Sequence, residues 1–494
     1  MCGIVGMHNG RSDSLITEML SSVLHRGPDG RGKWLNEREG LGHSRLSIID
    51  LETGAQPMSD AGNRRHVAFN GEIYNYRDLR RQLGEGRFRT KSDTEVILEL
   101  AANGDRPEQW VRKLDGMFAF ALIEDGALLL ARDPLGIKPL YLGERDGALL
   151  FASELKALSD VAERISEFPP GHIYSSKEGL RPYWQIQPHA EKISDASEAA
   201  AGIHDRLQKA VRKRLIADVP VGVFLSGGLD SSMIAAVARQ HKDPLDSFAV
   251  GTGESEDLRY ARHAADFIGT RHHEYIYTMK EAVEALPEVI YYLESFDCAL
   301  VRSAVPNYLL ARLARKHVKV ALSGEGADEL FAGYEYLRSI ELGALDAELL
   351  HITRALHNTN LQRCDRMSMA HGLEVRVPFL DVEMVDYAFR LSGHLKQHGA
   401  ERTEKWILRR VAERLLPPEI TRRKKLKFAA GAGLGERLAQ FAEREISDAA
   451  FAGKREIADG LFAQSKEELF YYLIFRQVYP HGDLIPLVGR SRSI

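Results

Sequence analysis

The sequence predicts an α+β layered domain followed by an α/β domain that ends in a helical region. Up to about residue 184, short apolar runs alternate with turn signals, which is typical of layered sheets. After about residue 198, apolar strands lead into glycine-rich turns and helices, and from about residue 340 the apolar spacing is helical. Residues 186–198 are polar, contain a proline and show no strong periodicity. We therefore place the two domains at residues 1–186 and 198–494.

The composition describes a folded chain and excludes several classes of protein. The 494 residues are 44% apolar and 28% charged, which suits a globular protein of more than one domain. The formal charge of −4 is too balanced for general nucleic-acid binding. No apolar run approaches the ~18 to 20 residues of a membrane span, and the first residues do not resemble a signal peptide. We expect a cytoplasmic protein with no nucleic-acid and no membrane partner.

Hairpins and two helices are expected in the first domain. Asp125-Gly126 and Asp146-Gly147 lie between apolar runs, where a type I′ hairpin turn favours Asp-Gly. The apolar spacing predicts helices at residues 14–24 and 93–102. This domain is therefore α+β rather than purely β.

The second domain repeats the order strand, turn, helix. This order is visible in VPVGVFLSGGLDSSMIAAVARQ, and further apolar strands follow in LDSFAVG and VKVALSGEGADELFAGY. Alternating strands and helices predict a parallel sheet with crossover helices. Later segments such as ELFYYLIFRQVY have helical spacing, so we expect a helical cluster at the C-terminal end.

Cys2 is a candidate nucleophile because it follows the initiator methionine. If Met1 is removed, the thiol and a free α-amine lie on the same residue. An α-amine titrates near ~7.7 to 8.0 and can act as the base that activates the nucleophile. Taken alone, Cys2 is more simply explained as a chance cysteine in an edge strand. The other motifs of the first domain decide between these readings.

Five motifs follow one another in the first domain. They are MCGIVG at the N-terminus, HRGPDG at 25–30, HSRLSIID at 43–50, FNGEIYNY at 69–76 and SDTEVI at 92–97. In this combination the chain resembles the glutaminase domain of the class II glutamine amidotransferases, an N-terminal-nucleophile fold. The resemblance implies that Cys2 attacks the side-chain amide of glutamine, forms a γ-glutamyl thioester and releases ammonia.

The same resemblance implies a pocket for glutamine. Asn70 and Gly71 would supply the donors of an oxyanion hole, and such preorganised donors are what a developing oxyanion requires. A zwitterionic amino acid needs a guanidinium for its carboxylate and carboxylates for its ammonium group. The residues implied for binding glutamine are Arg45, Asn70, Gly71, Glu72 and Asp93.

A second site is indicated by SGGLDSS at residues 226–232. The glycines let backbone N–H groups approach an anion, and the following helix contributes its positive N-terminal end. The chain contains no GxxxxGK[ST], so this is not a Walker A loop. The string instead resembles the pyrophosphate loop of ATPases that cleave ATP to AMP and pyrophosphate, in which Asp230 would help to hold Mg²⁺. A lone glycine-rich turn would equally suit a plain loop, but the preceding strand and the Asp-Ser-Ser ending favour the functional interpretation.

A third turn, SGEGADEL at residues 323–330, also follows an apolar strand. Acidic residues that face a phosphate site are compatible with Mg²⁺ between them, whereas without a metal they would be a charge cluster at a helix N-terminus. The motif resembles the synthetase domain of the asparagine synthetases. That resemblance implies that Asp230 and Asp328 bind the metal and that Glu325 supports formation of an acyl-adenylate. The residues implied for ATP are Leu225, Ser226, Gly227, Gly228, Asp230, Ser231, Ser232, Val250, Ser323 and Gly324.

Two cations complete the implied adenylation site. Arg302 lies in FDCALVRSAVPNYLL at 296–310 and Lys405 in EKWILRR at 404–410. Cations near a leaving pyrophosphate offset its growing charge, although a single cation on a helix is usually solvated. The run RCDRMSMAHGLEVRVPFLD at 363–381 supports the fold more than the substrate. The basic run RRKKLK at 422–427 is better explained as a solvated turn than as a phosphate contact.

Together these resemblances imply a glutamine-hydrolysing asparagine synthetase that uses aspartate, ATP and Mg²⁺ and forms a homodimer. One departure concerns the acceptor, because Leu337 and Arg338 stand where the family carries a histidine and a lysine. An amidotransferase that acts on another carboxylate, of a natural product or a cell-envelope precursor, therefore remains an alternative. A glutaminase with a regulatory nucleotide domain is a second alternative, and it would hydrolyse glutamine without stoichiometric AMP.

Overall fold

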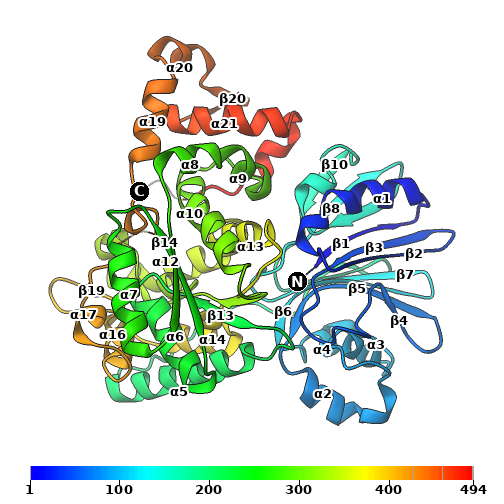
Figure 1. Ribbon diagram of the computed structural model, residues 1–494. Coiled ribbons are helices and arrows are strands. Elements are labelled where there is room, and N and C mark those ends of the chain that lie inside the picture. The colour runs from blue at the N-terminus through cyan, green and yellow to red at the C-terminus, as the bar shows by residue number, and fades with distance from the viewer. Residues whose placement is uncertain (1, 427, 459, 492–494) are drawn as a thin grey trace.

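The N-terminal part of the chain forms two six-stranded antiparallel sheets. The computed structural model describes residues 2–426, 428–458 and 460–491 (Figure 1). The first sheet contains, in spatial order, β10 (Arg164–Glu167), β8 (Tyr141–Arg145), β9 (Ala148–Ala152), β1 (Gly3–His8), β3 (Glu39–Arg45) and β2 (Gly30–Leu35). The second contains β12 (Gly179–Pro182), β11 (His172–Ser175), β7 (Ala127–Arg132), β6 (Gly116–Glu124), β5 (Arg65–Ile73) and β4 (Met58–Ser59).

Helices cover the outer faces of these sheets. Helix α1 (Asp13–Ser21) packs on β1 and β3, whereas α3 (Glu95–Ala101) packs on β5. Figure 1 shows α1 above the sheets, with α2 (Tyr76–Leu83), α3 and α4 (Pro107–Val111) below them. Since β6 is covered on both sides, its sequence GMFAFALIE is a continuous buried run rather than an alternating one. The expected α+β layered class is confirmed.

The predicted hairpins and helices are present in this part of the chain. Asp125 (φ 48°) and Gly126 (φ 80°) join β6 to β7, and Asp146 (φ 50°) and Gly147 (φ 79°) join β8 to β9. Positive φ at both central residues is what a type I′ turn requires, so these predictions are confirmed. The helix predicted at 14–24 ends at Ser21, and after it the chain tightens into the 3₁₀ turn Leu24–Arg26. The helix predicted at 93–102 spans Glu95–Ala101.

The C-terminal part is built on a five-stranded sheet in which every pair is parallel, as predicted. Its strands, in spatial order, are β15 (Arg271–Ile276), β14 (Asp246–Gly251), β13 (Val221–Phe224), β16 (Val320–Leu322) and β17 (Glu374–Arg376). Phe248 and Val250 join the apolar cluster of α10 (Cys298–Ala314), whereas Ala249 joins that of α6 (Leu229–His241) and α7 (Glu256–Ile268). Helices therefore cover both faces, which is why β14 is buried throughout.

The remaining helices surround this sheet and form the C-terminal region. They are α5 (Ala196–Arg214), α8 (Met279–Glu284), α9 (Leu286–Leu293), α11 (Ala327–Phe331), α12 (Leu342–Arg354), α13 (Asn360–Met369), α14 (Val382–Arg390), α15 (Gly393–Lys396), α16 (Trp406–Ala412), α17 (Pro418–Thr421), α18 (Phe428–Gly431), α19 (Arg437–Glu445), α20 (Asp448–Lys454) and α21 (Lys466–Val478). Two small hairpins pair β18 (Gln397–His398) with β19 (Thr403–Glu404) and β20 (Glu456–Ala458) with β21 (Leu461–Phe462). The chain beyond residue 340 is mainly helical, as predicted. The exceptions are these two hairpins and β17, which pairs with β16. Across the part of the chain that the structure describes, no helix is both long and apolar enough to cross a bilayer.

A buried network of charges joins the two parts of the chain. Arg26 Nη1 donates to Glu154 Oε1 at 2.5 Å and to Asp365 Oδ2 at 2.8 Å. Lys138 Nζ adds a bond to Asp365 Oδ1 at 3.1 Å, and all four side chains are at most 3% exposed. Burial alone would raise the pKa of Asp365, but Arg26 and Lys138 outweigh it and hold that pKa below its usual range. Asp365 therefore stays ionised and balances two buried cations.

We predict that Asp365→Asn lowers the free energy of unfolding by about 3–5 kcal/mol, because it leaves Arg26 and Lys138 buried with too little negative charge. Denaturant unfolding monitored by circular dichroism measures the change. Asp125→Asn is the matched control, since its ion pair with Arg64 is more than half exposed. Exposed pairs contribute about 0–1 kcal/mol, so a similar loss in both variants would contradict the prediction.

Candidate active sites

Cys2 is buried at the entrance to β1 and is held from both sides. Its backbone nitrogen donates to Asn70 Oδ1 at 3.0 Å, and Arg26 Nε donates to its carbonyl oxygen at 2.9 Å. Burial raises the pKa of the Cys2 thiol, whereas the charge of Arg45 lowers it. Met1 lies outside the described residues. The contact with Asn70 shows that the backbone nitrogen of Cys2 and the predicted oxyanion residue meet.

The two consecutive residues Asn70 and Gly71 lie within β5, which pairs with β6. Asn70 is fully buried, and its Nδ2 donor has no hydrogen-bond partner among the described residues. A Cβ at position 71 would lie 2.2 Å from the carbonyl oxygen of Met117, so only glycine fits there. An unpaired buried donor is costly unless a ligand satisfies it, and it suits a site that binds an oxyanion.

Glu72 and Asp93 are both buried close to Asn70 and Gly71. Glu72 Oε2 accepts from Arg376 Nη2 at 2.8 Å, while Glu72 Oε1 has no hydrogen-bond partner among the described residues. Asp93 Oδ2 accepts from the backbone nitrogen of Ile73 at 2.9 Å, and burial raises the pKa of Asp93 to about 6. The negative charge of Asp93 also contributes to the raised pKa of Glu72, after burial. The two carboxyl groups therefore share one polar pocket.

Arg376 is a member of this pocket that sequence reasoning missed. It lies on β17, 304 residues away from Glu72 in the chain, and its side chain is fully buried. Its own carbonyl oxygen accepts from the backbone nitrogen of Ser323, the first residue of the SGEGADEL turn. Arg376 was visible only as part of the run at 363–381, because nothing in the sequence pairs it with Glu72. One residue therefore contacts both predicted sites.

The SGGLDSS segment joins β13 to α6, but the helix begins earlier than predicted, at Leu229, so Asp230 and the two serines after it lie in its first turn. Gly227 has φ 67°, and a Cβ there would lie 2.2 Å from the carbonyl carbon of Tyr260. Ser226 Oγ accepts from the backbone nitrogen of Gly228 at 3.3 Å, and Ser231 Oγ accepts from that of Ser226 at 3.2 Å. These bonds hold the loop in a tight turn at the N-terminal end of α6. Ser232 and Leu225 are buried beside it, and Val250 is buried on the neighbouring strand β14.

The two glycine-rich turns of this half are in contact. A Cβ at Gly324 would lie 3.0 Å from both the Cβ of Asp230 and the backbone nitrogen of Ser231. The strands that precede the turns, β13 and β16, are parallel neighbours, so both turns emerge at the same edge of the sheet. That edge is where ligands bind in open α/β sheets.

Lys405 lies between the two predicted metal ligands. Its Nζ is 2.6 Å from Asp230 Oδ2 and 2.6 Å from Asp328 Oδ1. Lys425 Nζ is 2.8 Å from Asp328 Oδ2 and 3.8 Å from Asp230 Oδ2. Burial would raise the pKa of Asp328, but the two lysines reverse this and hold it below its usual range. A Cβ at Gly333 would lie 2.0 Å from Asp328 Oδ1, so this corner tolerates no side chain.

The basic run at 422–427 is solvated at Arg422 and Lys424, as predicted, but Arg423 and Lys425 have partners. Lys425 pairs with the two acids, and Arg423 donates from Nη1 to the carbonyl oxygen of Ser226 at 3.2 Å and from Nη2 to Asp257 at 2.6 Å. The Arg423 side chain is only 7% exposed. Lys427 lies outside the described residues. The sequence prediction fails for Arg423 and Lys425 because their partners lie about 100 to 200 residues away in the chain.

Family comparisons agree with this arrangement. Residues 1–168 match a glutamine amidotransferase domain, and residues 202–349 and 341–484 match asparagine synthase. Asparagine synthetase [glutamine-hydrolyzing] 2 of Arabidopsis thaliana is 38% identical over 523 residues, which cover 100% of this chain and 90% of that protein. The chain belongs to the glutamine-hydrolysing asparagine synthetase family.

Other relatives in this family are similar to the same extent. The probable glutamine-hydrolysing asparagine synthetase of Dictyostelium discoideum is 36% identical over 539 residues, covering 99% of this chain and 96% of that protein. Likeness to solved structures is weaker. Glutamine phosphoribosylpyrophosphate amidotransferase from B. subtilis, complexed with ADP and GMP, is 22% identical at a TM-score of 0.33, with 50% of this chain and 65% of that chain covered.

In this asparagine synthetase family member, Arg302 and Glu325 have partners of their own. Arg302 Nε donates to Glu467 Oε1 of α21 at 2.8 Å, and among the described residues no recorded contact joins Arg302 to the SGGLDSS loop. Glu325 Oε1 accepts from Arg363 Nη2 at 2.5 Å. The structure therefore brings Lys405, but not Arg302, into contact with the predicted metal ligands.

The region of the acceptor departure contains Glu329, a buried acid of the SGEGADEL turn. Glu329 Oε1 accepts from Tyr334 Oη at 2.5 Å and from Asn360 Nδ2 at 3.1 Å, and burial raises the pKa of Glu329 to about 7. Leu337 is fully buried, whereas Arg338 pairs with Glu404 next to Lys405. Of the two residues that differ from the family pattern, Leu337 and Arg338, only Arg338 has a polar side chain near the synthetase site.

Proposed function

We propose that this protein is a glutamine-dependent asparagine synthetase with two separate active sites. Glutamine is hydrolysed at Cys2 to glutamate and ammonia. Aspartate reacts with ATP to give β-aspartyl-AMP and pyrophosphate, and ammonia then displaces AMP to give asparagine. The proposal rests on finding both sites in one chain of this family. In the first domain, Cys2 contacts Asn70 in a buried position. In the second, Lys405 holds two acids beside the phosphate loop.

At the glutaminase site, the thiolate of Cys2 attacks the amide carbon of glutamine. The α-amine of processed Cys2, held by Asn70 Oδ1, takes the thiol proton and later passes it to the leaving ammonia. Asn70 Nδ2 and the backbone at Gly71 receive the negative oxygen of the tetrahedral intermediate. Arg45, Glu72 and Asp93 hold the carboxylate and ammonium ends of glutamine.

At the synthetase site, the loop at 226–232 binds the phosphates of ATP. Glu325 acts on the aspartyl carboxylate, and Lys405 balances charge as pyrophosphate leaves. Arg302, which pairs with Glu467, would have to leave that partner to reach the phosphate under attack. A Mg²⁺ ion fits this corner, because Asp230 and Asp328 are oxygen donors and Asp230 Oδ1 is buried without a hydrogen-bond partner among the described residues. Mg²⁺ commonly takes one or two protein carboxylates and completes its shell with phosphate and water. It would offset the charge of the β- and γ-phosphates.

The domain limits 1–186 and 198–494, a homodimeric state and a cytoplasmic location belong to the same proposal. The resemblance to the family supports each of them. Multi-angle light scattering of the purified protein measures the oligomeric state directly.

We predict that glutamine use falls as the pH drops below about 6. The pKa of Asp93 is raised to about 6 by burial, so Asp93 loses its charge below that pH and no longer attracts the ammonium group of glutamine. KM for glutamine should rise about tenfold per pH unit below pH 6. Glutaminase assays between pH 5 and 8 check this, and Asp93→Asn should raise KM at pH 8 and show no such pH dependence. A wild-type KM that stays constant down to pH 5 would contradict the proposed role of Asp93.

The overall reaction is tested by incubating the Met1-processed protein with Mg-ATP and glutamine, with and without aspartate. AMP, pyrophosphate and asparagine are quantified together. Equal amounts of asparagine and AMP that appear only with aspartate are the expected result. Release of glutamate without AMP would instead favour a glutaminase with a regulatory nucleotide domain. AMP formed with another carboxylate but not with aspartate would favour an amidotransferase of different specificity, and the departure at Arg338 would then explain it.

A further inference from the structure

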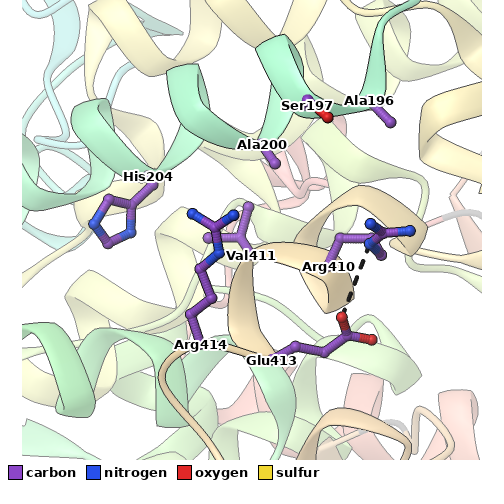
Figure 2. A pocket seen from close by; sticks show the side chains of 8 residues that line it. All are labelled: Ala196, Ser197, Ala200, His204, Arg410, Val411, Glu413 and Arg414. Atoms are coloured by element: carbon purple, nitrogen blue, oxygen red, sulfur yellow. Dashed lines mark ion pairs between the residues drawn. The ribbon is translucent and has the colours of Figure 1, made fainter.

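A pocket with a volume of about 210 Å³ lies between helices α5 and α16, outside both sites (Figure 2). Its lining residues are Ala196, Ser197, Ala200, His204, Arg410, Val411, Glu413 and Arg414. Helix α5 forms one wall with its first two turns and His204, and the other wall is the end of α16 with the residues that follow it. None of these residues belongs to the glutaminase or synthetase site.

The pocket holds two arginines that have few partners. Among the described residues, the Arg414 side chain makes no recorded hydrogen bond or ion pair, and Figure 2 shows it extending toward α5. Arg410 has only a long contact from Nε to Glu413 Oε2, at 3.8 Å, in addition to its stacking on Trp406. The neighbouring Arg409 is different, because it donates to Glu404 at 2.7 Å and to two backbone carbonyls. Both pocket arginines are exposed, so their guanidinium groups are accessible to a ligand.

Helix α5 adds further hydrogen-bonding groups to the same space. The Nδ1 atom of His204 is buried and has no hydrogen-bond partner among the described residues. Asp195 caps α5 by accepting only from the backbone nitrogen of Glu198, so the N–H groups of Ala196 and Ser197 have no intrahelical partner. Figure 2 shows the side chain of Ser197 beside that of Ala196 at this end of α5. A 19-residue helix also presents the positive end of its dipole here.

The charges of the pocket favour an anion. Arg410 and Arg414 contribute two positive charges and Glu413 one negative charge. The guanidinium fork matches the oxygens of phosphate, and phosphate has enough oxygens for two arginines, a serine hydroxyl and a helix N-terminus together. A single carboxylate has two oxygens and would leave several of these donors unused.

The pocket lies at the junction of two helices that lead to the two sites. Lys405, which contacts Asp230 and Asp328, immediately precedes α16. At the other end of α5, the carbonyl oxygen of Arg214 accepts from Arg376, the residue that also donates to Glu72. A ligand that joins α5 to α16 would therefore stabilise the packing of the helices behind both sites.

We propose that the α5–α16 pocket binds phosphate, either as the free ion or as the phosphate group of a small effector, separately from the nucleotide site. The inference concerns binding only and does not depend on which carboxylate the enzyme amidates. Arg410 and Arg414 hold the phosphate oxygens, and Ser197 and His204 complete the site from α5.

Isothermal titration calorimetry of the full chain with inorganic phosphate tests the proposal. The nucleotide site is first saturated with Mg²⁺ and a non-hydrolysable ATP analogue, so that the loop at 226–232 is occupied. We expect saturable binding of about one phosphate per chain. Aspartate, AMP and sodium chloride at equal ionic strength form the comparison arms. No phosphate binding, or binding of aspartate in place of phosphate, would overturn the proposal.

Four variants distinguish a specific site from a general effect of charge. Arg414→Gln and Arg410→Gln should each weaken phosphate binding about 10-fold or more, since each removes a charge-assisted bond. Glu413→Gln should tighten binding severalfold, because it removes the one acid of the pocket. Arg212→Gln is the matched control, as Arg212 is an exposed arginine on α5 that does not line the pocket. Equal affinity in wild type and Arg414→Gln, or equal weakening by Arg212→Gln, would contradict the site, and circular dichroism confirms that each variant is folded.

Discussion

Replacement of Cys2 by alanine is expected to abolish glutamine-dependent asparagine synthesis while synthesis from ammonia continues. The substitution removes the nucleophile, so glutamine hydrolysis should fall by about 10³-fold or more. The synthetase site should keep its geometry, because Cys2 contacts Asn70 and Arg26 through backbone atoms that alanine retains. Asparagine formation is measured with glutamine and, separately, with ammonium chloride at pH 8, with AMP quantified in each assay.

The matched control for this experiment is Cys298→Ser. Cys298 is the half-buried thiol at the start of α10 and lies outside the glutaminase pocket, so glutamine hydrolysis should stay within about twofold of wild type. Loss of both glutamine- and ammonia-dependent synthesis in Cys2→Ala would refute the assignment of two separate sites. Retention of glutamine hydrolysis in Cys2→Ala would refute its role as nucleophile.

Asp328→Asn is expected to produce the opposite pattern. AMP and pyrophosphate formation should fall by about 10²–10³-fold, while glutamine hydrolysis persists. Asp328 contacts both Lys405 and Lys425, and its low pKa shows that the site is organised around the ionised carboxylate. Asparagine has nearly the same shape but no charge, so it removes the proposed metal ligand and leaves two lysines with only Asp230 to balance them. Coupled assays for pyrophosphate and glutamate measure the two reactions on one preparation.

Two comparisons make the Asp328 experiment decisive. Asp266→Asn applies the same chemical change to an exposed residue of α7 and should leave both reactions unaltered. Raising Mg²⁺ should partly restore ATP binding by Asp328→Asn if the lost group is a metal ligand. Wild-type rates of AMP formation in Asp328→Asn would exclude Asp328 from the metal site, and an equal loss of glutaminase would point to a general disruption of the fold.

Most of the local structure was predictable from the sequence. Asp125-Gly126 and Asp146-Gly147 adopt positive φ in the expected hairpins because the turn geometry depends on those two residues themselves. The SGGLDSS segment follows a strand and leads into a helix, as its flanking apolar patterns indicate, although the helix already begins at Leu229. The end of the first helix was less predictable, since the chain leaves the helix at Ser21 and tightens into a 3₁₀ turn.

The partners of charged residues were much less predictable. Arg302 was expected at the adenylation site, and in the structure it pairs with Glu467. Lys425 was expected in solvent and contacts Asp328. An ion pair depends on which segments the fold brings together, and residues separated by about 100 residues or more carry no periodic signal of their contact.

The sequence by itself determined the order of the elements, the hairpin turns, the phosphate loop and the identity of the candidate nucleophile. These features depend on local backbone preferences and on apolar periodicity, which neighbouring residues define. Only the tertiary structure decided that Arg376 holds Glu72, that Lys405 joins Asp230 to Asp328, and that Arg410 and Arg414 line a pocket between α5 and α16. These contacts arise from the packing of distant segments, where burial removes water and forces each charge to find a partner.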